Sequence, residues 1–252
     1  MTSQSETQVG AAERSDKISE VLARQIVRDL ARQRLDSGAM LPPEAVMLRR
    51  LQVGRASLRE ALRILEVYGL ITIKPGPGGG PIVHTPSSRE FARTACFYFN
   101  VRGATLRDLL EARRSLEPLL ARLAATSGST AAIERLMMSV DAGDKARDAA
   151  DVERWRVHAQ EFHGLVATAS GNRILDLFGL SLRDLFNDRV AERVMGTGDR
   201  AVVGDEHRAI AGAIAAGQPE LAESLMAAHM NTFTEIAVQV IEGLLEDVID
   251  WR

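Results

Sequence analysis

The order of segments between residues 41 and 83 constrains the fold of this chain more than any other feature. Apolar residues recur twice with helical spacing and then alternate as they do in a strand. The predicted segments are a helix over about 44–51, a turn at 53–54, a second helix that Gly69 closes, a strand at 71–74, a glycine-rich tip at 75–81 and a returning strand at 82–83. This order predicts a winged helix, in which the second helix of the pair enters the major groove of DNA.

The second helix carries polar groups at its start and an apolar side behind them. Arg55, Ser57 and Arg59 supply two cations and a hydroxyl group, which suit a helix end that meets phosphates and base edges. The apolar side consists of Leu58, Ala61, Leu62, Leu65 and Val67. Simpler roles stay open for the polar residues. Ser57 and Glu60 have the spacing of a capping box, and Arg59 and Arg63 can be solvated surface charges.

Charge is unevenly distributed along the chain, although the net charge is only −3. Between residues 24 and 74 there are ten Arg and Lys side chains and five Asp and Glu side chains, so this head has five excess positive charges. The rest of the chain therefore sums to −8. A basic head on an acidic body is typical of a phosphate-contacting module joined to a part that does not touch DNA.

Composition favours helices outside the wing, since aromatic residues make up only 4% of the chain and Ala and Leu are abundant. We expect a mainly α protein, with an N-terminal winged helix-turn-helix and a small two-stranded wing, followed by a bundle of six or seven helices. The predicted helices outside the helix-turn-helix are about 18–35, 89–100, 105–127, 130–141, 151–169, 173–195, 200–216 and 219–246.

These patterns divide the chain into a disordered tail at 1–16, a winged-helix DNA-binding domain at 17–84, a linker at 85–88 and an all-helical effector-binding and dimerisation domain at 89–252. No apolar run approaches the roughly 18 residues of a membrane span, and the polar start lacks the regions of a signal peptide. We therefore expect a cytoplasmic, nucleoid-associated protein. The single Cys96 excludes an internal disulfide and, in its apolar run, predicts a buried thiol.

Short motifs in the head resemble the winged helix of the GntR superfamily of bacterial transcription regulators. The matching pieces are Gly38, Leu41-Pro42-Pro43-Glu44, Val53-Gly54-Arg55, Leu58-Arg59-Glu60-Ala61-Leu62 and Gly69-Leu70. The helical remainder is similar to the FCD ligand-binding domain of the FadR-like branch. Its matching pieces are EARRSLE at 111–117, FHGLVATASGN at 162–172, and EHRAIAGAI at 206–214 followed by His229. Together these pieces cover nearly the whole chain.

The resemblance implies which residues contact DNA. They are Arg55, Ser57, Arg59 and, in the wing, Gly76 and Gly78. One family arginine is absent, because its position is Ala45, and we expect that contact to be missing or moved to Arg49 or Arg50. A glycine run alone is also compatible with a merely flexible turn. The resemblance further implies a homodimer on a double-stranded DNA operator with two-fold symmetry.

Three of the five histidines, His163, His207 and His229, lie on apolar helical faces. On the residues alone they can be buried core histidines, or a facial metal site if their helices converge, and the sequence cannot show convergence. The resemblance implies a divalent metal (Zn, Ni or Mn) on these three histidines together with an Asp four residues before the first. That position is Ala159, and the loss of an anionic ligand should weaken metal binding.

Arg113 falls inside the apolar stripe of its predicted helix. An inward guanidinium needs an anionic partner, which is either Glu117 one turn further on or a bound ligand. The resemblance implies that this arginine meets the carboxylate of a small organic-acid effector. We therefore expect an effector pocket formed by Arg113, the three histidines and Asn172.

The function that these features predict is a ligand-responsive transcription regulator, a repressor, whose helical domain binds a small organic acid and thereby alters operator binding. The alternative is a helical metal-dependent enzyme that is tethered to DNA. Against an enzyme, the sequence contains no nucleophile with a positioned base, no HExxH motif and no phosphate loop before a helix.

Overall fold

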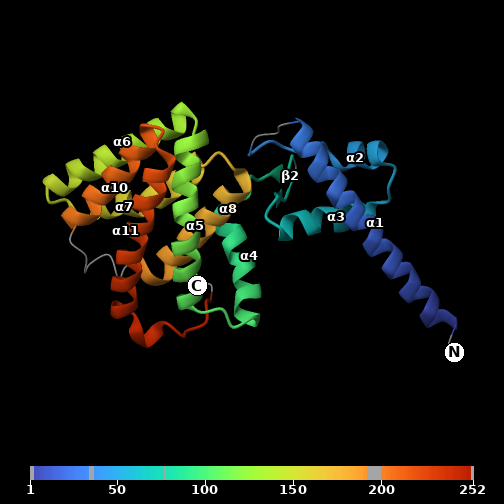
Figure 1. Cartoon of the computed structure of the whole chain (residues 1–252). Coiled ribbons are helices and arrows are strands. Elements are labelled where there is room, and N and C mark those ends of the chain that lie inside the picture. Colours follow the sequence, from blue (N-terminus) through green and yellow to red (C-terminus); the bar gives the residue numbers. More distant parts are fainter. Residues whose placement is uncertain (1–2, 34–36, 77, 192–199, 251–252) are drawn as a thin grey trace. The chain divides into compact units, whose positions relative to one another are not determined.

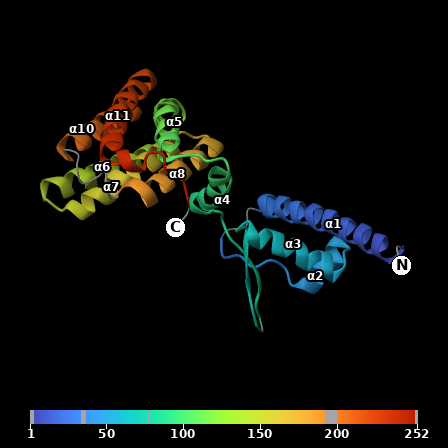
Figure 2. The same cartoon turned by 90° about the horizontal axis from the view of Figure 1, so that it is seen from below.

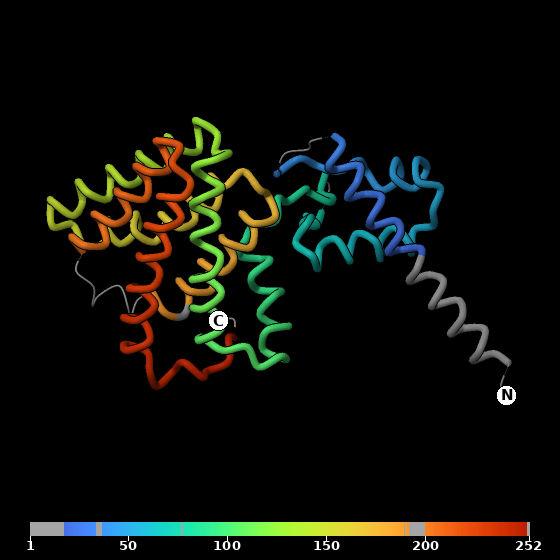
Figure 3. Tube along the Cα trace, in the orientation of Figure 1, coloured from blue at the N-terminus to red at the C-terminus, as the bar shows by residue number. Residues whose placement is uncertain are grey.

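The computed structural model describes residues 3–33, 37–76, 78–191 and 200–250, without the side chains of residues 3–17 and of Arg189 (Figure 3). The chain divides into two compact units, Met1–Ser87 and Ser88–Arg252. Each unit has hydrophobic core residues of its own. Within the described ranges no helix has the length and apolar character needed to cross a membrane.

The N-terminal unit is a winged helix. Its elements are α1 (Ser3–Gln33), α2 (Glu44–Leu51), α3 (Arg55–Val67), β1 (Ile71–Lys74) and β2 (Gly80–Val83) (Figure 1). The two strands are antiparallel, with Ile71 opposite Val83 and Lys74 opposite Gly80. The core of this unit consists of Leu22, Ala23, Ile26, Leu41, Met47, Leu58, Ala61, Leu62, Leu65, Ile71 and Val83. The apolar side predicted for the second helix thus packs inward, apart from Val67, which is 74% exposed.

The turn between α2 and α3 determines how the second helix starts. Gln52 adopts a left-handed conformation (φ 53°, ψ 44°), and the extended Gly54 is the N-cap of α3. Because Gly54 has no side chain, α3 begins without a side-chain cap. Ser57 is the third residue of the helix and not its N-cap, so the alternative role as a capping box with Glu60 is excluded.

Two boundaries of the N-terminal unit differ from the sequence prediction. Residues 1–16 are predicted as a disordered tail, whereas α1 is assigned from Ser3. Strand β2 begins at Gly80, two residues earlier than predicted, which shortens the tip. Gly79 explains the tight turn, since a Cβ atom there would lie 2.2 Å from the carbonyl oxygen of Lys74. The predicted end of the first helix at residues 35–36 lies outside the described residues.

The C-terminal unit is a helical bundle. Its elements are α4 (Ser88–Val101), α5 (Leu106–Ser127), α6 (Thr130–Asp148), α7 (Val152–Ala169), α8 (Arg173–Phe186), the π-helix η1 (Asn187–Ala191), α10 (Arg200–Ala215), α11 (Pro219–Val240) and the 3-10 turn η2 (Glu242–Leu244). Helices α5 and α11 pack along each other, and α6 packs along α7 (Figures 1 and 2). The Cys96 thiol is buried and is not part of a disulfide, as predicted.

Three predicted helix ends in this unit are corrected. Helix α6 continues through Gly143 to Asp148, because Gly143 lies in the packing contact with α7, where an added Cβ would be 3.2 Å from the Cβ of His158. The helix predicted over 173–195 changes to a π-helix at Asn187, and residues 192–195 lie outside the described part. The last helix ends at Val240 rather than near residue 246.

Candidate functional site

The three predicted histidines come together in the C-terminal unit. His163 lies on α7, His207 on α10 and His229 on α11. One ligand nitrogen from each ring lies within 4.8 Å of the other two. The Nε2 atoms of His207 and His229 are 3.3 Å apart, and both residues are buried. The convergence that the sequence could not establish is therefore present in the fold.

Neighbouring side chains fix the orientation of each imidazole ring. The Nδ1 atom of His163 contacts Oε2 of Glu117, and Nδ1 of His229 lies 2.7 Å from Oε2 of Glu206. His207 is held by stacking, since its ring lies nearly parallel to Phe162 with 3.8 Å between the ring centroids. In both rings the carboxylate thus engages Nδ1, the outer nitrogen, and leaves Nε2, the inner nitrogen, available to a metal.

The electrostatics of the cluster favour neutral imidazoles beside an ionised carboxylate. Burial, reinforced by the two other histidines, lowers the pKa of His207 well below its usual value. Burial also lowers the pKa of His163, although Glu117 opposes this effect. Burial raises the pKa of Glu117, but Arg113 and His163 outweigh burial and bring that pKa to about 2. Neutral imidazole is the form that binds metal ions.

The donor set fits a divalent transition metal. Tetrahedral zinc with Zn–N bonds of about 2.0–2.1 Å spaces its nitrogen ligands by about 3.3–3.4 Å, which matches the 3.3 Å between the Nε2 atoms of His207 and His229. Three imidazoles with an open fourth position are also a common arrangement for metals that bind an exogenous ligand. Ala159, one turn before His163, is buried beside the cluster and offers no ligand atom.

Arg113 is buried next to the histidines and has incomplete hydrogen bonding. Its Nε atom donates to Oε1 of Glu117 at 2.7 Å, so the protein partner predicted from the helical spacing is present. Its guanidinium carbon also lies 4.3 Å from the ring centroid of Phe186. The Nη1 atom, however, is fully buried and has no hydrogen-bond partner among the described residues. An unsatisfied buried cationic donor is costly, which points to an anion that completes its hydrogen bonds.

The histidines and Arg113 line one cavity of about 180 Å³. Most of its other walls are apolar, and they include Trp155, Ala159, Phe186, Val203, Phe233 and Ile236. Asn172, which is also predicted to line this pocket, is not among the lining residues. Its side chain instead accepts hydrogen bonds from the backbone nitrogens of Ile174 and Leu175 and caps α8.

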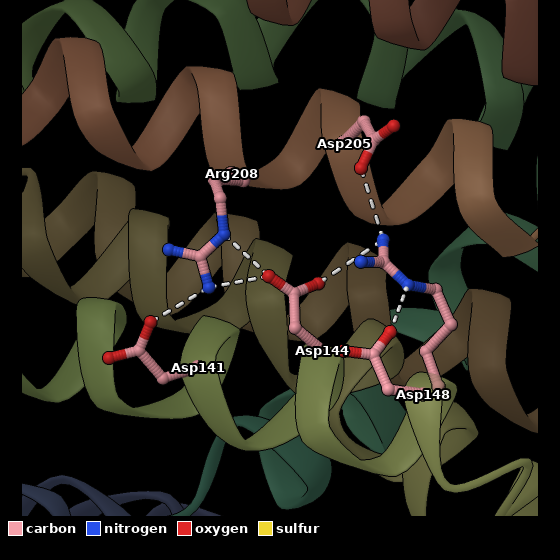
Figure 4. Close-up of polar contacts among 6 residues, drawn as sticks. Asp141, Asp144, Asp148, Asp205 and Arg208 are labelled. Atoms are coloured by element: carbon pink, nitrogen blue, oxygen red, sulfur yellow. Dashed lines mark hydrogen bonds and ion pairs between the residues drawn. The ribbon is translucent and has the colours of Figure 1, made fainter.

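An ion-pair network holds α10, which carries Glu206 and His207, on α6 (Figure 4). Arg208 of α10 binds Asp141 and Asp144 of α6, while Arg147 of α6 binds Asp205 of α10 at 3.1 Å. Close packing accompanies these pairs, since a Cβ atom at Gly204 would lie 2.5 Å from Nη1 of Arg147. Asp205 therefore points to α6, whereas Glu206, its neighbour, lines the cavity.

In the N-terminal unit, the cations predicted to contact DNA differ in how they are engaged. Arg55 opens α3 and is exposed, and Ser57 is half-buried. Arg59 lies 3.5 Å from Glu44, and Arg50 pairs with Asp29. Such exposed pairs are weak and can give way to phosphates. The remaining predicted residues are Arg49, which is exposed and forms no ion pair within the described part, and Gly76 and Gly78, which lie exposed near the wing tip.

Comparison with known proteins identifies the family of this chain. Residues 18–79 match the bacterial regulatory proteins of the gntR family, and residues 108–232 match the FCD domain. The chain is 31% identical over 200 residues to the uncharacterized HTH-type transcriptional regulator Rv0494 of Mycobacterium tuberculosis. The aligned residues make up 77% of this chain and 78% of that protein. This chain belongs to the GntR family.

A further relative and a solved structure are similar to this chain over most of its length. The Glc operon transcriptional activator of Escherichia coli is 28% identical over 229 residues, which is 85% of this chain and 87% of that protein. The solved structure of a Streptococcus agalactiae GntR protein has the same fold, with a TM-score of 0.70, 24% identity and coverage of 86% of this chain and 99% of that one. The GntR protein described here is thus a transcription regulator with a helix-turn-helix DNA-binding domain and an FCD domain.

Two roles in the FCD domain of this GntR protein are not apparent from the sequence. The helical spacing predicts Glu117 only as a partner of Arg113 and gives no sign of its contact with His163. For Glu206, the only sequence signal is its place directly before His207 in the EHRAI motif. That adjacency is a weak signal, because Asp205 beside it binds α6 instead.

Proposed function

We propose that this GntR protein is a ligand-responsive repressor. It binds a two-fold symmetric operator as a homodimer, and a small organic monocarboxylate binds in the FCD cavity beside a divalent metal and changes its affinity for DNA. The observation that carries the effector assignment is the buried Nη1 atom of Arg113, a cationic donor without a partner among the described residues, in a cavity that also has apolar walls.

Charge supports a monoanionic effector. Arg183 also lines the cavity, but Asp184 pairs with it at 2.6 Å and cancels its charge. Of the other charged groups, Glu117 and Glu206 carry two negative charges, and Arg113 with a divalent metal would carry three positive charges. One positive charge is left over for the ligand to neutralise, and buried charges need such compensation. A single carboxylate that meets the metal and Nη1 of Arg113 supplies it.

The size and lining of the cavity support a compact effector with an apolar body. A cavity of about 150 Å³ lined by apolar side chains accommodates benzene, and this cavity has a volume of about 180 Å³. Trp155, Phe233 and Ile236 line it and offer apolar surface to such a body. The effector class that we propose is therefore a monocarboxylate whose carbon skeleton is about the size of one ring.

In this arrangement His163, His207 and His229 would hold the metal through their inner nitrogens. When bound, the metal supplies a Lewis-acidic site for a carboxylate oxygen. The chain's own contribution is to orient the effector, since Arg113 offers a fixed hydrogen-bond donor that Glu117 keeps in place. The apolar walls exclude water and so strengthen these contacts.

Helix α8 offers a route for the signal. On one side, Arg183 and Phe186 line the cavity. On the other, Asp184 accepts a hydrogen bond of 2.6 Å from Oγ of Ser88, and Oγ of Ser181 donates to the backbone oxygen of Ser88. Ser88 is the first residue of the C-terminal unit and directly follows the DNA-binding unit in the chain. An effector that shifts α8 would therefore move Ser88, the point at which the DNA-binding unit is connected to the bundle.

The test combines calorimetry with DNA binding. Zinc-loaded protein without a His tag is titrated with a panel of monocarboxylates that includes benzoate, and operator sequences are selected from a genomic pool. We expect at least one carboxylate to bind and to release DNA, and R113K to bind it more weakly, because Lys lacks the forked donors of Arg. Equal binding by wild type and R113K would remove Arg113 from the site. Turnover of the ligand would favour the metal-dependent enzyme instead.

A further inference from the structure

Two glutamates stand behind the histidine cluster in equivalent positions. Glu117 contacts Nδ1 of His163, and Glu206 contacts Nδ1 of His229 at 2.7 Å. In both pairs the carboxylate accepts a hydrogen bond from the Nδ1–H group, which leaves Nε2 as the nitrogen with a free lone pair. For His229 this is the atom that lies 3.3 Å from Nε2 of His207.

A carboxylate that is hydrogen-bonded to a metal-binding histidine affects how tightly the metal is held. A histidine that binds a metal almost always donates its other ring N–H to a carboxylate, a carbonyl or a water, and this contact fixes the tautomer and raises the basicity of the ligand. The effect matters more when the ligands themselves carry no charge. Three imidazoles are neutral ligands, and Ala159 contributes no anion to them.

We propose that Glu117 and Glu206 are positioning residues of the metal centre, and that they supply from behind the histidines the negative charge that Ala159 does not supply beside the metal. This proposal rests on the proposed metal site. The two residues do not act equally, because Glu117 also binds Nε of Arg113, whose positive charge offsets part of its own. Glu206 has no arginine partner in the described residues, so its charge is not offset in this way.

Glu117 has a second consequence for the site. Its two oxygen atoms hold different groups, since Oε1 accepts from Arg113 and Oε2 contacts His163. One buried side chain thus fixes both the donor proposed for the effector and a ligand proposed for the metal. A change in metal occupancy at His163 would shift Arg113 through this carboxylate, which links the two binding events.

The decisive comparison is E206Q with D205N. Both variants remove one carboxylate charge at adjacent positions of α10. Asp205, however, points to α6 (Figure 4) and binds Arg147 there, whereas Glu206 binds His229. Zinc affinity of the full-length protein is measured by competition with a chelator. Loss of such a carboxylate lowers metal affinity about 10–100-fold, so we expect that loss for E206Q and a change of less than about threefold for D205N.

Two additional readouts separate positioning from mere folding. The visible spectrum of the cobalt-substituted protein should change in E206Q and stay as in wild type in D205N, and E206D should recover part of the zinc affinity. E117Q should also bind zinc more weakly, provided that its circular dichroism and melting temperature in chelator show a folded protein. The proposal is overturned if E206Q and D205N have the same zinc affinity and cobalt spectrum. Wild-type protein that takes up no zinc would instead refute the proposed metal site.

Discussion

Replacing Arg113 by Ala should destabilise the C-terminal unit by about 3–5 kcal/mol, the usual cost of removing one partner of a buried ion pair. The side chains of Arg113 and Glu117 are only 2% and 7% exposed, and their charged atoms lie 2.7 Å apart. Without Arg113, the Glu117 carboxylate stays buried with His163 as its remaining partner. In a protein of this size, each kcal/mol lowers the melting temperature by about 2–4 °C, so we expect a decrease of about 6–20 °C.

The exposed ion pair between Arg122 of α5 and Glu223 of α11 serves as the control for the buried pair within α5. Arg122 and Glu223 lie 2.9 Å apart, but their side chains are 46% and 38% exposed. Exposed pairs contribute at most about 1 kcal/mol, so R122A should be nearly as stable as wild type. The double variant R113M/E117Q removes both buried charges and should regain most of the stability that R113A loses.

The assay is urea and thermal denaturation in the presence of a chelator, followed by circular dichroism. A difference of less than about 1 kcal/mol between the free energies of unfolding of R113A and R122A would refute a large cost of leaving Glu117 unpaired. An R113M/E117Q protein as unstable as R113A would refute it as well, because the loss would then not come from an unpaired Glu117 charge. If R113A is destabilised as expected, weaker effector binding by this variant could come from partial unfolding. R113K keeps the positive charge and is therefore the variant for the binding experiments.

Three further predictions concern DNA binding and pH. R55A should weaken operator binding and make the slope of log affinity against log salt concentration shallower by about 0.9, measured by fluorescence anisotropy between roughly 50 and 200 mM salt; an unchanged slope would exclude a phosphate contact. G79A would place a methyl group 2.2 Å from the carbonyl oxygen of Lys74, so the tip of the wing would have to change its conformation. This variant should therefore bind DNA more weakly, while its zinc affinity stays at the wild-type value. The pKa values of His163 and His207 are lowered by burial, so the unfolded chain takes up protons below about pH 6.5 that the native state does not, and the free energy of unfolding of metal-free protein should fall as the pH decreases. A constant free energy of unfolding between pH 7 and pH 5 would contradict the buried, neutral state of the two imidazoles.

The sequence predicts the order of elements well because each element carries its own periodicity. Helices α3 and α7 have continuous apolar stripes, and the wing has alternating residues between turn formers. The errors occur where distant contacts override a local signal. Gly143 reads as a helix end, yet it continues α6 because the close approach of His158 requires a residue without a side chain.

The candidate site is predictable to the extent that its residues lie on the inner faces of single helices. His163, His207, His229 and Arg113 are inward on their own stripes, and the structure places all four at one cavity. The partnership between Glu117 and His163 depends on the packing of α5 against α7, 46 residues apart in sequence, which no local pattern encodes. The prediction for Asn172 fails for a local reason, since its side chain caps α8 and does not reach the cavity.

A substitution at Ala159 tests how an added negative charge in the cavity affects the affinities for the metal and for the effector. A159D would place a carboxylate one turn before His163 on the same helix face, beside the cluster that Glu117 and Glu206 already support. The added anion should raise zinc affinity and, because it neutralises the remaining positive charge, should weaken the binding of a monocarboxylate.

Zinc competition and carboxylate calorimetry on the same preparation measure both effects of A159D. The control is A209D, which adds the same charge at an exposed position of α10 and should change neither affinity appreciably. If A159D strengthens or leaves unchanged the binding of the carboxylate while it strengthens the binding of zinc, the effector does not complete the charge of the metal centre. A decrease in carboxylate affinity alone, with zinc affinity as in wild type, would place the effector in the cavity but away from the metal.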